Sequence, residues 1–147
     1  MSALFAFLHH LFAFVLVAAV AIEFVLIRSI TRESAARIVA TDAILGMSAT
    51  ALLVVGLLRV FYFEKGAGYY FSSHAFLGKL TLFIILASLS AIPTIEFLSW
   101  RRALAAGQTP SPAPQKLKQV KSIIHFELMG IVFILLCAAI MARGGWM

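Results

Sequence analysis

Apolar residues dominate four long stretches of the chain, and polar residues gather in the segments between them. The stretches cover about residues 3–27, 42–63, 74–100 and 120–142. Each exceeds the roughly 20 mostly apolar residues that an α-helix needs to cross a bilayer. None shows the alternation of apolar and polar positions that is typical of membrane β-strands. The pattern predicts an all-α integral membrane protein, a bundle of four transmembrane helices, because a helix satisfies its own backbone hydrogen bonds in lipid.

The composition agrees with this class of protein. Of the 147 residues, 63% are hydrophobic and 12% are charged, whereas soluble domains are usually about 45–50% apolar. No stretch outside the four runs is long enough for a second core, so we expect one membrane domain, residues 1–147. The first run is too long for a cleavable signal core and is interpreted as a retained helix. A single cysteine, Cys137, excludes a disulfide within the chain and covalent haem attachment through CxxCH.

Basic residues are distributed unevenly between the two sides of the predicted bundle. The connection between the second and third helices has Lys65 as its main loop cation. The first and third connections are richer, which predicts that they are cytoplasmic and that both termini lie outside a bacterial inner membrane. The net charge of +6 then reflects contact with anionic lipid and not nucleic acid, because the cations are split among short loops. The cations of the two richer connections are Arg28, Arg32, Arg37, Arg101, Arg102, Lys116, Lys118 and Lys121.

The predicted connections differ in character. The segment around residues 28–41 is expected to form a short interfacial helix. Residues 103–118 contain a glycine and three prolines and predict a flexible or extended linker. Within the third apolar run, Pro93 predicts a kink, with Ser90 or Thr94 satisfying the carbonyl group that the proline leaves free.

Ionisable residues at membrane depth form two layers, and such residues are functional candidates because charge is costly there. The outer layer contains His9, His10, Arg59, His74 and Lys79. Imidazoles on separate helices suit the axial positions of a haem b, and nearby cations suit its propionates. The alternatives are cations that reach phosphate headgroups, histidines with interfacial hydrogen-bonding roles, and a ligand other than haem.

Helical periodicity distinguishes the two adjacent histidines. Fourteen residues separate His9 from Glu23, so at 100° per residue they share a helix face to within about 40°. If Glu23 avoids lipid, His9 points into the bundle and His10 points away. The same arithmetic places His74 and Glu96 on one face of the third helix.

The inner layer contains Glu23, Glu96, His125 and Glu127, with Asp42 at the lip of the second helix. These residues predict a proton relay or a charge-paired structural network, with proximity to lipid headgroups as the alternative. A metal site is the weaker interpretation, because His125 and Glu127 lie about 200° apart on a helix and cannot face one ion.

Two segments carry a family resemblance, "ALFAFLHHLFAFVLVAAVAIEFVLIR" and "YYFSSHAFLGKLTLFIIL". The chain resembles an uncharacterised family of small four-helix bacterial inner-membrane proteins. It is more distantly similar to the four-helix, haem-containing protoporphyrinogen IX oxidase family of bacteria. That likeness rests on His9 or His10, on Arg28 and on Lys79 with the following leucine, whereas Leu77 stands where that family commonly has a histidine. It implies haem b within the bundle and a redox role in porphyrin metabolism.

Together these observations predict a membrane haem b protein with an electron-transfer or oxidoreductase role and quinone or porphyrin as partner. The alternative is a non-enzymatic accessory or structural subunit, in a larger membrane complex or a homo-oligomer. The predicted iron ligands are His9 and His74, with His10 as the substitute for His9, and the predicted propionate partners are Arg59 and Lys79. The residues predicted to supply or remove protons are Glu23, Glu96 and His125.

Overall fold

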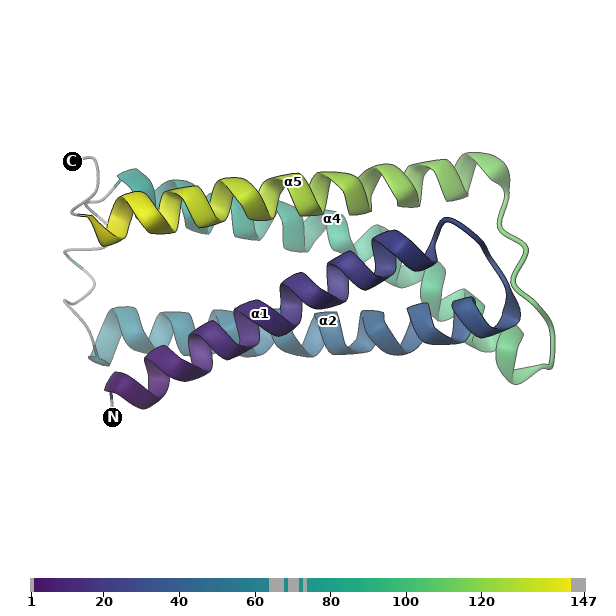
Figure 1. The fold of residues 1–147 in the computed structure, drawn as a ribbon, viewed down its shortest axis with the longest axis horizontal. Coiled ribbons are helices and arrows are strands. Elements are labelled where there is room, and N and C mark those ends of the chain that lie inside the picture. The colour runs from purple at the N-terminus through teal and green to yellow at the C-terminus, as the bar shows by residue number, and fades with distance from the viewer. Residues whose placement is uncertain (1, 64–67, 69–71, 73, 144–147) are drawn as a thin grey trace.

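Four long helices form a bundle in the structure, a computed structural model that describes residues 2–63, 68, 72 and 74–143 (Figure 1). They are α1 (Ser2–Leu26), α2 (Arg32–Leu58), α4 (His74–Ala105) and α5 (Pro114–Ala142). All four are long and apolar enough to cross a membrane. The predicted class, an all-α protein with four membrane-spanning helices, is confirmed.

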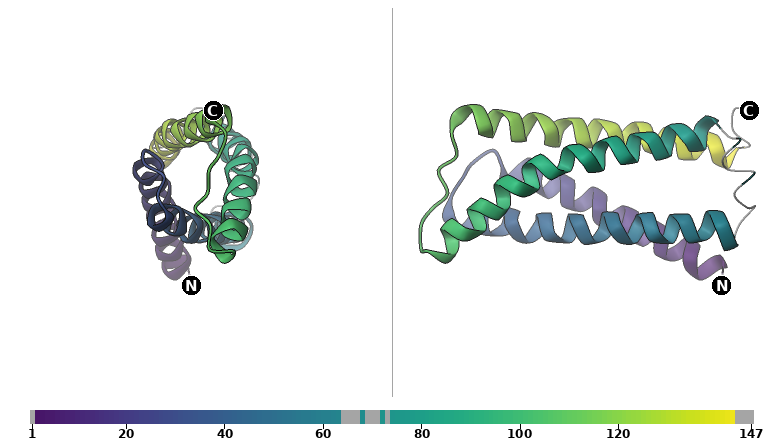
Figure 2. Two further views of the ribbon diagram at one scale, coloured as in Figure 1. Left: turned by 90° about the vertical axis from the view of Figure 1, so that its right-hand side faces the viewer. Right: turned by 180° about the vertical axis from the view of Figure 1, so that it is seen from behind.

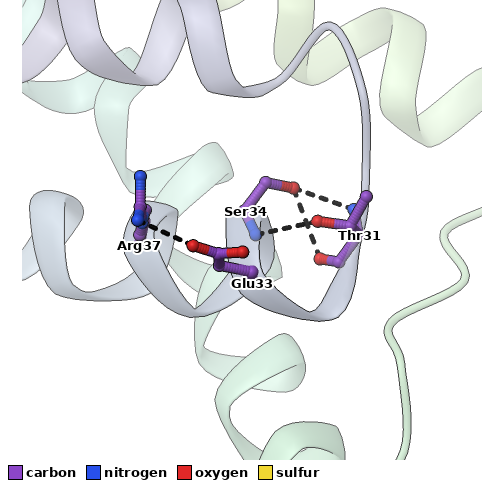
Figure 3. Close-up of polar contacts among 4 residues, drawn as sticks. All are labelled: Thr31, Glu33, Ser34 and Arg37. Atoms are coloured by element: carbon purple, nitrogen blue, oxygen red, sulfur yellow. Dashed lines mark hydrogen bonds and ion pairs between the residues drawn. The ribbon is translucent and has the colours of Figure 1, made fainter.

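Helix α2 begins about three turns before the expected position, and no separate interfacial helix precedes it. The Thr31 hydroxyl accepts a hydrogen bond from the Ser34 backbone N–H (3.0 Å), and the Thr31 N–H donates to the Ser34 hydroxyl (2.8 Å; Figure 3). One turn later, Arg37 pairs with Glu33 at 2.7 Å. This reciprocal cap satisfies backbone groups that a helix start leaves unpaired. The polar segment therefore forms the first turns of α2, and the interfacial-helix prediction is wrong.

The other end of α2 runs directly into a short π-helical segment, η1 (Arg59–Phe63). The backbone N–H of Arg59 is bonded to the carbonyl groups of both Val55 and Gly56. Single π-helical turns often occur at functional sites because the wider turn changes the direction of the side chains that follow. Here η1 contributes two residues, Arg59 and Val60, to the cavity described below.

The helices are arranged as a ring in the order α1, α2, α4, α5. Each packs on its two neighbours, and the diagonal pairs α1–α4 and α2–α5 make no contact within the described part of the chain. The end-on view of Figure 2 shows this ring. Helix α1 begins and α5 ends at the same end of the bundle, here called the termini end, and the α1–α2 and α4–α5 connections lie at the opposite, linker end (Figure 1). The assignment of the linker end to the cytoplasm stays a prediction, and Lys65 lies outside the described residues.

The α4–α5 linker is shorter than predicted. Helix α4 continues to Ala105, where Gly107 adopts a positive φ of 77°. This conformation, which glycine adopts readily, lets the Gln108 N–H donate to the Ala103 carbonyl at 2.9 Å and closes the helix. Helix α5 begins at Pro114, and proline suits the first turn because the N–H it lacks has no partner there.

The most completely buried apolar side chains lie toward the linker end. Phe97 and Trp100 of α4 pack with their rings tilted by 59° and their centroids 5.0 Å apart, and both are buried. On the outside of the bundle, by contrast, Phe7, Phe14 and Met47 are 61–75% exposed. Large apolar side chains on the outer face are those expected of a surface in contact with lipid. The packed linker half fixes the helix positions, and the termini half leaves room for a cavity.

Candidate functional site

A cavity of about 230 Å³ lies in the termini half of the bundle. All four helices and η1 contribute to its walls, which are mainly apolar. Leu53 and Leu135 on its rim are 37% and 55% exposed, so the cavity opens toward the lipid. An apolar pocket with a few convergent polar groups is the usual form of a small-molecule site.

Four polar side chains line this cavity, and the sequence placed all four in the outer layer: His9, His10, Arg59 and Lys79. A glycine makes room for the first of them. A Cβ atom added at Gly56 would lie 3.4 Å from His9 Cε1 and 3.6 Å from Nδ1, so the His9 ring packs directly on the α2 backbone. His9 Nδ1 is buried and has no hydrogen-bond partner among the described residues. A buried polar atom of this kind is unusual and marks a place where a ligand or water can bind.

The neighbouring imidazole, His10, also lines the cavity, although helical periodicity predicted that it points away; its side chain is exposed and is oriented by its own helix. His10 Nδ1 lies 2.7 Å from the Ala6 carbonyl oxygen, so this nitrogen carries the proton and donates it. In the neutral ring, Nε2 is then the atom with a free lone pair. Histidines that bind metals commonly have this arrangement, in which the second ring nitrogen donates to a carbonyl group. The two rings, His9 and His10, meet edge to face with centroids 6.1 Å apart.

The structure does not bring His74 into this cavity. His74 is the first residue of α4, its side chain is exposed, and it is not part of the cavity wall. The buried Phe76, two residues later, faces the cavity in its place. The predicted pair of iron ligands, His9 and His74, is therefore not assembled around this space. Position along the helix, which periodicity alone does not fix, causes the difference.

A second polar cluster lies deeper in the bundle, toward the linker end. It contains Glu23 of α1, Asp42 of α2 and Glu127 of α5, which are 1%, 6% and 4% exposed. Glu23 and Asp42 lie close enough to interact directly, and both Asp42 and Glu127 act electrostatically on Glu23. We refer to these three residues as the carboxyl cluster.

Helix α4 contributes hydroxyl groups to the carboxyl cluster. The side chain of Thr94 lies close enough to Asp42, and that of Ser90 close enough to Glu127, to interact with the carboxyl group. These two residues flank Pro93, and the sequence had predicted that one of them satisfies the backbone there; both hydroxyls reach carboxyl groups. One oxygen atom of each cluster carboxyl still lacks a hydrogen-bond partner within the described residues.

Two residues predicted to handle protons lie apart from this cluster. Glu96 is half-buried, and its Oε1 accepts a hydrogen bond from Trp100 Nε1 at 3.0 Å. His125 is exposed, with its ring 6.3 Å from that of Phe24. Because Glu127 is buried and His125 is not, the two point in different directions, as their spacing requires. Of the predicted trio, only Glu23 belongs to the carboxyl cluster.

The sequence interpretation underrated Asp42 because it placed that residue at the start of the second helix. Since α2 begins at Arg32, Asp42 lies ten residues inside it, about 15 Å along the axis. The available signal was the Thr31–Ser34 capping pattern, which marks the true helix start. No group of three histidine, cysteine or acidic side chains in the described part of the chain has the geometry of a metal site.

The fold and its two polar sites define a small four-helix membrane protein with an apolar cavity at one end and buried carboxyl groups toward the other. The chain belongs to the family described as predicted membrane protein (DUF2214), whose family model matches residues 1–145. This membership confirms the resemblance to an uncharacterised membrane-protein family. No curated protein and no solved structure matches the chain.

Proposed function

We propose that the protein binds haem b in the cavity at the termini end and serves in membrane electron transfer or as an oxidoreductase. The observation that carries this proposal is the convergence of two imidazoles and two cations on one otherwise apolar cavity. Haem is flat and apolar with two carboxylates at one edge. An apolar cavity suits its ring, imidazoles suit its iron, and cations suit its carboxylates.

The donor set fits haem in a specific way. His10 would hold the iron through Nε2, because its Nδ1–H already donates to the Ala6 carbonyl group. Arg59 and Lys79 would pair with the propionates. The cavity of about 230 Å³ is open at its exposed rim, so its enclosed volume does not set the size of the ligand that it can hold. Bound haem would supply one-electron redox chemistry, and the protein supplies the binding and orientation.

His9 has a supporting role in this proposal. Its ring is packed on Gly56 and stands edge-on to His10, so it limits where the neighbouring imidazole can move. His74 is expected to be dispensable because its exposed side chain lies outside the cavity wall. A quinone is the proposed electron partner, since it dissolves in the same bilayer, and a porphyrin is the substrate that the distant family resemblance implies.

The experiment is an absorption spectrum of the protein purified in mild detergent, recorded oxidised and dithionite-reduced, with haem added. We expect a Soret band in the wild type and in His74→Ala, and loss of that band in His10→Ala. His74→Ala is the matched control, because it removes the same side chain from the same end of the bundle. Retention of the band in His10→Ala together with its loss in His9→Ala would reassign the ligand to His9.

A wild-type spectrum that stays featureless after haem addition would refute the haem proposal. The remaining interpretation would then be the accessory or structural subunit of a larger membrane complex or homo-oligomer. Co-purification from native membranes, followed by mass measurement of the intact assembly, would identify that complex. The absorption spectrum of one preparation therefore distinguishes a haem protein from an accessory or structural subunit.

A further inference from the structure

The carboxyl cluster poses a problem of charge that its neighbours do not solve. Glu23, Asp42 and Glu127 come from three helices and meet where each is more than nine-tenths buried. Three ionised carboxylates in such a place would repel one another and lose their hydration, which costs several kcal/mol for each charge. The folded protein must therefore hold a basic side chain, protons or another cation among these carboxyl groups.

Among the described residues, no positively charged side chain is found to act on the carboxyl cluster. From α4 the facing groups are the hydroxyls of Ser90 and Thr94, which are neutral. The described cation that follows Glu23 most closely in sequence is Arg28, two residues after the end of α1, and its guanidinium carbon lies 4.9 Å from the centre of the Phe24 ring. The groups that act electrostatically on Glu23 are both acidic. The described residues thus supply acceptors and hydroxyls, and the positive charge must come from solution.

The arrangement of the carboxyl groups indicates which cation this is. Glu23 and Asp42 interact directly, and two ionised carboxylates, which are both acceptors, cannot satisfy one another, whereas a protonated carboxyl can donate to its neighbour. Each carboxyl of the cluster also has one buried oxygen with no partner in the described chain. A neutral carboxylic acid tolerates this arrangement far better than a carboxylate, since only the charged form carries the full desolvation cost. The geometry does not meet the requirements of a metal site within the described residues.

A groove connects this cluster with the linker end of the bundle. It has a volume of about 600 Å³, lies between α2 and α4, and has Asp42 and Thr94 in its wall. Along α2 it extends from Ala36 to Met47, about 16 Å, and at its mouth stands the exposed Arg101. The groove is open on the outer face of the bundle, where Met47 is exposed, and it reaches from Arg101 near the linker end to one member of the carboxyl cluster.

We infer that Glu23, Asp42 and Glu127 form a proton-binding site that exchanges protons with the solution at the linker end through the groove between α2 and α4. In this site Glu23 and Asp42 share a proton, and the Ser90 hydroxyl donates to Glu127. Asp42 is the member that communicates with the groove. The inference is independent of haem and applies equally to the protein without a cofactor.

The test uses dicyclohexylcarbodiimide, a lipid-soluble reagent that reacts with protonated carboxyl groups in apolar surroundings. The carboxyl proton moves to a nitrogen of the reagent, its oxygen bonds to the central carbon, and the adduct rearranges to a stable acylurea with no group lost. The wild-type protein in detergent is treated across a pH series and analysed by intact mass and peptide mapping. We expect one adduct, on a member of the carboxyl cluster, with labelling that falls about tenfold per pH unit above its midpoint.

Glu33→Gln is the matched control, because Glu33 is exposed and paired with Arg37 on the surface. It should label as the wild type does, whereas Glu23→Gln should lose at least about nine-tenths of the adduct, because an amide in place of the Glu23 carboxyl removes the shared proton. If Glu23→Gln does not fold, the pH series on the wild type still decides the question. Absence of any adduct in folded protein at every pH would refute the inference. Protection by sodium chloride but not by choline chloride would also overturn it, since the site would then bind sodium.

Discussion

The packing of α4 against α5 allows a quantitative prediction at Gly130. A Cβ atom added there would lie 2.9 Å from Leu86 Cδ2 and 3.1 Å from Cγ, and closer still to Cδ1. Ordinary carbon contacts are about 3.5–4.0 Å, so Leu86 would have to move. Overpacking of this kind costs about 1–3 kcal/mol. Alanine is the better helix former by about 1 kcal/mol, which partly offsets that cost.

Gly46→Ala is the matched control for Gly130→Ala. A Cβ atom at Gly46 would meet nothing within 4 Å, so this variant has the gain in helix propensity and no overlap. The difference between the two variants therefore isolates the contact with Leu86, and we expect it to be about 1–3 kcal/mol in the free energy of unfolding. At about 3 °C per kcal/mol for a chain of this size, Gly130→Ala should melt about 3–9 °C below Gly46→Ala.

The chain has its own reporter for this measurement. Cys137, the single cysteine, is half-buried on α5, and its Sγ would lie 3.6 Å from a Cβ atom at Gly78 of α4. A dye that fluoresces on reaction with thiols thus follows separation of α4 and α5 during heating. The reasoning also predicts that Leu86→Ala removes the penalty, since the three atoms nearest to the added Cβ all belong to Leu86. An equal loss of stability for Gly130→Ala in the Leu86→Ala background would refute it.

Two further predictions concern hydrogen bonds near the linker end. Thr31→Ala removes the hydroxyl that caps α2 and should destabilise the protein by about 1 kcal/mol; Thr50→Ala, which removes an exposed hydroxyl bonded to its own helix, should change the melting temperature little. Trp100→Phe removes the donor to Glu96 and should also cost about 1 kcal/mol in thermal unfolding. Glu96→Gln keeps an acceptor oxygen for Trp100 and should leave both stability and any haem spectrum near those of the wild type. A larger effect for Thr50→Ala than for Thr31→Ala, or for Glu96→Gln than for Trp100→Phe, would contradict these assignments.

The sequence predicted the membrane class correctly because that prediction depends only on the total hydrophobicity of each long run. A run of about 20 apolar residues has no stable alternative to a helix in lipid, whatever its neighbours are. The beginning of α2 was missed for the complementary reason. Residues 32–41 are polar enough to suggest a surface segment, but the Thr31–Ser34 cap and the Glu33–Arg37 pair make them helical. Local hydrogen bonds decide helix ends, and average hydropathy does not detect them.

The two sites differ in how far periodicity could predict them. For His9 and Glu23, which lie on one helix, the arithmetic of 100° per residue gave a shared face, and in the structure His9 lines the cavity while Glu23 is buried. The arithmetic does not relate one helix to another. It could not exclude His74 from the cavity or bring Asp42 to Glu23, because these relations depend on how far each helix is shifted along its axis.

The unknown shift of each helix along its axis also explains why the fully buried and the half-buried acids of this chain are hard to distinguish from the sequence. Asp42 and Glu96 both occur near the linker ends of apolar helices, and sequence context treats them alike. In the structure, Asp42 faces two other carboxyl groups, whereas Glu96 accepts a hydrogen bond from Trp100 on its own helix. An acid with such an intrahelical donor needs nothing from other helices. An acid whose neighbours are other acids and neutral hydroxyl groups depends on a proton or another cation from outside the protein. Sequence composition does not reveal which acids have such neighbours, so it could not identify the carboxyl cluster.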